Sequence, residues 1–128
     1  MPVMQQPEPD RRNAETAVLT KATVRAADRL RLPARTLASV LGLSEPTISR
    51  MRRGEYRLGS NEKSFELAIF FVRLFRSLDS LFGGDEAVAQ SWLNAENLVL
   101  GGRPIDKITT IAGLTDVIAY LDARRAIV

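Results

Sequence analysis

The sequence predicts an all-α protein. Apolar residues recur at helical spacing in two segments, Leu19, Ala22, Ala26 and Leu30 near the start and Leu114, Val117, Ile118 and Leu121 near the end. No stretch shows a competing strand pattern. Glycine and proline stand at breaks between apolar segments rather than in repeats. We therefore expect helices joined by short turns.

Length and composition limit the organisation and the chemistry. A chain of 128 residues with 45% hydrophobic residues suits one compact unit, or two very small subdomains that share a core. The chain has no cysteine and no histidine, which excludes disulfides, thiolate or imidazole metal sites, and Ser–His or Cys–His catalysis. We expect no cofactor, no metal and no catalytic residue, and the lack of cysteine is compatible with a reducing cytoplasm.

Neither membrane insertion nor secretion is expected. The longest apolar run, residues 67–72, is far shorter than the roughly 20 residues of a membrane-spanning helix. Residues 1–12 contain no apolar run and do not resemble a signal peptide. We predict a soluble, cytoplasmic protein without a membrane partner.

Charge is distributed unevenly along the chain. Residues 1–60 hold eleven Lys/Arg against six Asp/Glu, whereas residues 61–128 hold seven against nine. A basic front half suggests a polyanionic partner for that half. The alternative is a solvated, arginine-rich helix surface, and charge alone does not decide between the two.

The front half divides into a tail and three helices. Residues 1–12 hold three prolines and many polar groups and are predicted to form a disordered tail, followed by a region over 13–60. Asn13 is expected to cap a first helix that ends near residue 32, and Pro33 to open a second over 33–41. Gly42 ends that helix, and Ser44 caps a third over 44–53, which Gly54 closes.

The back half, residues 61–128, begins with a long helix over 61–82. Its polar residues form one narrow stripe, so we expect this helix to be central to the core and shared with a second chain. Gly83 and Gly84 break it, and Asp85 caps a helix over 85–94 with Val88, Trp92 and Leu93 inward. Beyond a turn at 101–102, Pro104 opens a short helix, Gly113 is the next break, and a last helix covers 115–126.

Residues 34–53 have the spacing of a helix-turn-helix. Ala38 is the small residue at the helix crossing, Gly42 supplies positive φ in the turn, and Ile48 anchors the second helix. This Ala–Gly–Ile pattern resembles the Xre/Cro repressor family. The outward residues of the recognition helix are predicted to be Ser44, Glu45, Thr47, Ser49 and Arg50, which would face base edges. Arg52, Arg53 and Arg57 follow, placed to reach phosphates.

A helical hairpin without DNA-binding activity has a similar pattern and stays an alternative. Small helix pairs with glycine turns are common, and a pair of arginines at a helix end is often only solvated. Glu45 would repel phosphate unless it accepts a hydrogen bond from cytosine.

A second motif lies in residues 92–104, WLNAENLVLGGRP, followed by IDKITTIAGLTDVIAYLDAR. The order of Trp-Leu, Asn, Gly-Gly and Pro resembles the toxin-binding domain of the Xre/MbcA/ParS antitoxins. The resemblance covers roughly residues 62–128. It implies a homodimeric antitoxin encoded beside a RES-domain toxin that uses NAD, with the C-terminal segment blocking the NAD pocket and the helix-turn-helix binding operator DNA.

The resemblance places the toxin-binding residues in the last helix and tail: Tyr120, Arg124, Arg125, Ala126, Ile127 and Val128. A guanidinium can pair with a carboxylate or occupy an anion site. Many members of the family carry glycine near this point, where this chain has Ala123-Arg124-Arg125. Termini are otherwise usually frayed. Trp92 is most simply a core residue, and Asn97 a turn or cap residue.

Two other functions are weighed. A stand-alone phage-type transcriptional repressor would use the long helix only for dimerisation. An enzyme would need an acid–base pair, and no two neighbouring carboxylates have the spacing that implies one. We therefore expect no enzymatic activity.

Overall fold

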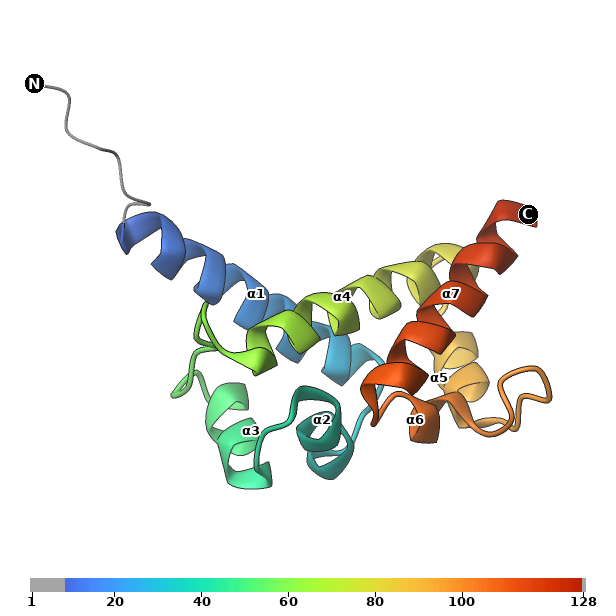
Figure 1. Ribbon diagram of the computed structural model, residues 1–128, viewed down its shortest axis with the longest axis horizontal. Coiled ribbons are helices and arrows are strands. Elements are labelled where there is room, and N and C mark those ends of the chain that lie inside the picture. The colour runs from blue at the N-terminus through green and yellow to red at the C-terminus, as the bar shows by residue number, and fades with distance from the viewer. Residues whose placement is uncertain (1–8, 128) are drawn as a thin grey trace, which may run out of the picture.

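The computed structural model describes residues 9–127, and over that range the chain forms seven α-helices and no named strand. Figure 1 shows α1, α4 and α7 as the long helices, with α2 and α3 packed below α1 and α4, and α5 and α6 below α7. The predicted all-α class is confirmed. The helices are α1 (Pro9–Arg29), α2 (Ala34–Leu41), α3 (Glu45–Arg52), α4 (Lys63–Leu81), α5 (Glu86–Asn94), α6 (Pro104–Lys107) and α7 (Ile111–Ile127).

The first helix begins earlier than predicted. It starts at Pro9, so the expected cap at Asn13 is wrong, and residues 9–12 are helical rather than part of a tail. Proline at the first helical position is favourable because its missing N–H would be unpaired there in any case. Residues 1–8 of the expected disordered tail lie outside the described residues.

Helix α4 lies at the centre of the core. It packs against α1, α2, α5 and α7, and it buries Leu67, Ala68, Phe71, Leu74 and Leu78. Residues of the front and back halves belong to one continuous hydrophobic cluster. The halves therefore share a core, and the central position expected for the long helix is confirmed.

One side of α4 is left without cover in the single chain. Ile69 is 49% exposed and Phe70 37%, and Val18 of α1 is 68% exposed. These apolar side chains explain why the helix shows so little polar surface. The predicted second chain on this helix stays a prediction.

Gly113 is not a break but part of α7, so that prediction is wrong. A Cβ at Gly113 would collide with the carbonyl oxygen of Lys107. Glycine is required because the end of α6 approaches the first turn of α7 closely. From there the predicted apolar face of α7 is confirmed, since Leu114, Val117, Ile118 and Leu121 are all buried.

Helix α5 has a different inner face from the one predicted. Asp85 caps it as expected, with its side chain accepting a hydrogen bond from the Val88 N–H at 3.2 Å. Val88 itself is 43% exposed, so the inward placement predicted for it is wrong, whereas Leu93 is buried as predicted and Ala89 is buried as well. The cap fixes where the helix starts, and the packing of α5 on the core decides which side faces inward.

Candidate functional site

The turn between α2 and α3 has the geometry of a helix-turn-helix. Gly42 adopts φ 68°, the left-handed conformation, and its N–H donates to the Ala38 carbonyl. Ala38 is buried at the crossing, and Ile48 of α3 is fully buried beneath it. The three positions predicted to build the motif therefore have the expected structural roles.

The N-terminal turn of α3 is stabilised by a polar cap. The Ser44 hydroxyl accepts a hydrogen bond from the Thr47 N–H at 3.3 Å, which confirms Ser44 as the cap. Glu45 in the first turn carries a charge that the helix dipole favours at this end. Glu45 therefore has a structural role at the start of α3 that does not depend on a contact with DNA.

Thr47 is buried, so the prediction that it faces outward is wrong. Its hydroxyl lies 2.8 Å from the Ser44 hydroxyl and accepts a hydrogen bond from the Arg50 guanidinium at 3.1 Å. Position i+3 on a helix brings these side chains together. Thr47 therefore supports Arg50, which is exposed, rather than facing outward itself.

Arg52 also departs from the prediction, because its side chain turns back onto the protein. Its guanidinium donates to the Leu32 carbonyl at 2.8 Å and lies 3.6 Å from the Asp28 carboxylate. The Nε atom of Arg52 is buried and has no hydrogen-bond partner. Arg53 is paired with Glu55 at 3.2 Å on the surface. Of the arginines expected to reach phosphates, Arg53 and Arg57 are exposed and Arg52 is not free to do so.

At the other end of the molecule, an aromatic column supports the C-terminal helix. The rings of Phe82 and Trp92 lie 6.3 Å apart, and those of Trp92 and Tyr120 stack at 6.0 Å. The Arg124 guanidinium lies 5.8 Å from the Tyr120 ring centre and donates to its hydroxyl at 3.3 Å. Trp92 is half-buried and packs against the hydrophobic core, which agrees with its prediction as a core residue. The column supports an exposed Arg124 near the end of α7.

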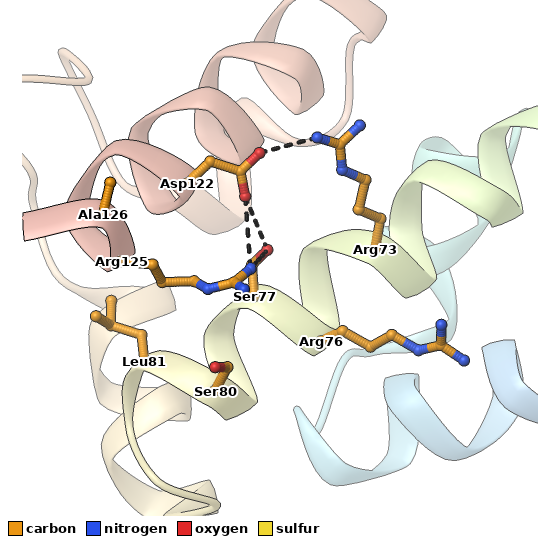
Figure 2. Close-up of a pocket in the computed structure, with 8 residues that line it drawn as sticks. All are labelled: Arg73, Arg76, Ser77, Ser80, Leu81, Asp122, Arg125 and Ala126. Atoms are coloured by element: carbon orange, nitrogen blue, oxygen red, sulfur yellow. Dashed lines mark hydrogen bonds and ion pairs between the residues drawn. The ribbon is translucent and has the colours of Figure 1, made fainter. Parts of the chain in front are cut away.

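Arg125 faces a different surface, the groove between α4 and α7 shown in Figure 2. Its guanidinium donates to the Ser77 hydroxyl at 3.1 Å and lies 3.7 Å from the Asp122 carboxylate. Asp122 also accepts hydrogen bonds from Arg73 at 2.9 Å and from Ser77 at 3.1 Å. The cluster ties the end of α7 to α4.

The remaining predicted residues of the C-terminal segment are partly placed. Ala126 is exposed, Ile127 is the last residue of α7, and Val128 lies outside the described residues. The residues of this cluster that the sequence analysis did not identify are Arg73, Ser77 and Asp122. The i, i+3 spacing of Asp122 and Arg125 was a usable signal, whereas nothing in the local sequence identified Ser77.

Two family models match this chain, one over each part of the site. The antitoxin Xre-like helix-turn-helix domain matches residues 11–73, and the antitoxin Xre/MbcA/ParS C-terminal toxin-binding domain matches residues 77–126. The chain belongs to the Xre/MbcA/ParS antitoxins. A search of curated proteins finds no match.

The family assigns a function to each part of the antitoxin. Its helix-turn-helix domain binds DNA and its C-terminal domain binds a toxin. Neither of these two domain families is enzymatic. Within residues 9–127, no helix is both long and apolar enough to cross a bilayer. Over the same residues, no group of three or more acidic side chains is placed to hold a metal ion.

The two matches meet inside α4 rather than at a linker. Arg73 ends the helix-turn-helix match and Ser77 begins the toxin-binding match, one helical turn later. The Arg73–Asp122 ion pair therefore joins the two matched regions of the antitoxin (Figure 2). The predicted division at residues 60 and 61 stays a proposal about how the chain is organised.

Proposed function

We propose that this antitoxin neutralises an NAD-consuming RES-domain toxin by placing its C-terminal segment in the toxin's active site. We propose further that it works in the cytoplasm as a homodimer and represses its own operon through α3. Neither activity requires a cofactor.

The observation that carries the toxin proposal is the position of Arg124. This guanidinium lies at the exposed end of α7, inside the toxin-binding match, and is supported by the Trp92–Tyr120 stack. A pocket that binds NAD must hold a pyrophosphate, and arginine pairs with phosphate or with the carboxylates of such a site. Tyr120, Arg124, Ala126 and the last two residues would enter the pocket, while Arg125 fixes the direction of the helix.

The two proposed binding surfaces are far apart. Figure 1 shows α3 at one end of the molecule and the C-terminal end of α7 at the opposite end. A toxin bound at α7 would leave α3 uncovered. Operator binding and neutralisation are therefore compatible in one complex.

For DNA, the proposal uses the exposed side of α3. Ser44, Glu45, Ser49 and Arg50 would face base edges, and Arg53 and Arg57 would contact phosphates. Thr47 holds Arg50 through a hydrogen bond, and Arg52 ties the end of α3 to Leu32 and Asp28. Contacts to several phosphates make operator affinity fall steeply with salt concentration.

The proposed dimer uses the uncovered apolar side of α1 and α4. Val18 and Ile69 line one groove between these helices, and Phe70 lies next to Ile69 in sequence. A second copy that covered these side chains would remove apolar surface from water. Ile69→Ser should then shift the purified antitoxin toward monomer in sedimentation velocity.

The test uses the full chain and the product of the adjacent gene. NAD consumption by that product is measured alone, with the antitoxin, and with an antitoxin truncated after Ala123. We expect inhibition by the full chain, loss of inhibition by the truncated chain, and operator binding by both. A neighbour that does not consume NAD would refute the RES assignment, and full inhibition by the truncated chain would refute the C-terminal mechanism.

A further inference from the structure

A short loop between α5 and α6 leaves two adjacent apolar side chains largely exposed to solvent. Leu98 is 98% exposed and Val99 is 78% exposed, the largest values among the exposed large hydrophobic residues described. Single exposed apolar residues are ordinary, but two adjacent ones at a loop tip place a continuous apolar surface in water. Neither side chain contributes to the core of the single chain.

The loop is held in one conformation by its own hydrogen bonds. The Asn97 carbonyl accepts from the N–H groups of Gly101 at 2.9 Å and Gly102 at 3.2 Å, and the Asn97 N–H donates to Gly102 at 3.0 Å. The Asn97 side chain accepts from the Leu100 N–H at 3.0 Å, as expected for a turn residue. Gly101 has φ 76°, which a residue with a side chain adopts only with strain.

Leu100 anchors this loop, because it is partly buried and packs against the core. With its N–H bonded to Asn97, the turn directs Leu100 inward and leaves Leu98 and Val99 at the tip. A rigid loop loses little conformational entropy when it binds, so its apolar contact is converted efficiently into affinity. The loop therefore has the properties of a preformed contact.

Charged residues flank the apolar tip in the sequence. Glu96 precedes it, and the Arg103–Asp106 ion pair at 3.0 Å follows it. The Asp106 carboxylate is hydrogen-bonded to the Arg103 guanidinium and raises the pKa of Arg103, so the two charges satisfy each other. An apolar centre with a polar rim is the usual arrangement of a protein–protein contact.

We propose that Leu98 and Val99 insert into an apolar depression on the cognate toxin and form an affinity anchor separate from the C-terminal segment. The loop lies inside the toxin-binding match. Figure 1 shows it at the end of the molecule away from α3 and from the N-terminal part of α1. The toxin is therefore the partner that reaches this loop, whereas DNA on α3 and a second copy on α1 and α4 do not.

This anchor rests on toxin binding by the C-terminal domain but not on the toxin's chemistry. The loop holds the partner and the C-terminal segment inhibits it, so affinity and inhibition are separate readouts. The first is measured by calorimetric titration of the product of the adjacent gene into full-length antitoxin. The second is NAD consumption by that product.

The decisive variant is Leu98→Ser with Val99→Ser. We expect toxin affinity to fall on the order of 100-fold, because two apolar side chains lose a buried environment. The melting temperature and the operator affinity of the free antitoxin should stay unchanged, since both side chains are already in water. Ile111→Ser is the matched control: it removes an apolar side chain that is 59% exposed and lies in the toxin-binding match, outside both this loop and the proposed dimer face, and it should leave toxin affinity unchanged.

A second variant tests the loop conformation with both apolar residues retained. Gly101→Ala strains the turn at φ 76° and should weaken toxin binding about tenfold or more.

Unchanged toxin affinity in the double serine variant would overturn the proposal. Loss of self-association with toxin affinity intact would also overturn it, because the loop would then contact a second copy. A partner that binds through the loop but does not consume NAD would refute only the RES assignment.

Discussion

The chain contains two Arg-Arg pairs at the ends of helices, and their comparison shows how differently one dipeptide can be used. Arg52-Arg53 closes α3 in the DNA-binding domain, and Arg124-Arg125 lies near the end of α7 in the toxin-binding domain. Cations are favourable at both positions because the C-terminal end of a helix carries partial negative charge. In sequence terms the pairs are equivalent.

In each pair one arginine is bonded to a residue on a distant segment and the other only to a side chain within four residues, but the order is reversed. In α3 the first arginine is bound, with Arg52 donating to the Leu32 carbonyl. In α7 the second is bound, with Arg125 donating to Ser77. Arg53 bonds to nearby Glu55, and Arg124 bonds to Tyr120 one helical turn away. We expect the arginine bonded to a distant segment to stabilise the fold and orient its helix, and the other one to be available to a partner.

The largest expected effect concerns exposed arginines on the DNA side. Arg50→Ala with Arg57→Ala should lower operator affinity on the order of 100-fold, because one proposed base contact and one proposed phosphate contact are lost. The slope of log affinity against log salt should decrease by about one for the lost phosphate contact. Fluorescence anisotropy at several salt concentrations measures both. Toxin inhibition should be unaffected, and an unchanged operator affinity would place the DNA contacts elsewhere.

On the toxin side, Arg124→Ala should weaken inhibition about tenfold or more, because the proposed contact in the NAD pocket is lost. Arg125→Ala should weaken it less, since Arg125 acts by holding α7 against α4. Both effects are measured as inhibition constants for NAD consumption. Equal losses in the two variants would contradict the division into an exposed and a bound arginine.

Arg52→Ala should destabilise the fold by about 1–3 kcal/mol, because a charge-assisted hydrogen bond is lost and the Leu32 carbonyl loses its partner. Arg53→Ala is the matched control, with an effect within about 0.5 kcal/mol, because its pair with Glu55 is on the surface. Urea denaturation measures both. If Arg52→Ala kept its stability and lost operator affinity, Arg52 would be a DNA contact after all.

The local sequence was sufficient for features that depend on neighbouring residues. The helix-turn-helix at Ala38, Gly42 and Ile48 follows from backbone and packing rules over eleven residues, and the cap at Ser44 from its place before a helix. The turn at Gly101 and Gly102 follows from the two adjacent glycines. These features are local, so their interactions were visible in the sequence.

The errors arose where distant residues decide the outcome. Arg52 is directed by Leu32, twenty residues away in sequence, and Arg125 by Ser77, which is 48 residues away. Gly113 was expected to break a helix, whereas it is a glycine because Lys107 passes close to it. Thr47 is a different case, because its partners Ser44 and Arg50 are each three residues away. Its predicted outward placement is wrong because helical spacing alone does not show which side of α3 packs on the core.

The smallest expected effect concerns a tyrosine. Tyr56, in the front half, donates to the Glu62 carboxylate at 3.3 Å, whereas Tyr120, in the back half, accepts from Arg124. Burial first, and then the charge and hydrogen bond of Glu62, raise the pKa of the Tyr56 phenol above its ordinary value of 10.0. The folded state therefore holds this proton more tightly than the unfolded state does.

The contribution of the Tyr56 phenol to the free energy of unfolding is complete below about pH 10 and is lost as the pH rises through the pKa of the folded state. Tyr56→Phe should destabilise the antitoxin by at most about 1 kcal/mol at neutral pH and should reduce the loss of stability above about pH 10. Denaturation of the wild type and the variant at about pH 9 and pH 11 measures the difference. Tyr120→Phe is the control, since it keeps the Tyr56–Glu62 bond. An equal alkaline loss in wild type and Tyr56→Phe would show that Tyr56 does not contribute to it.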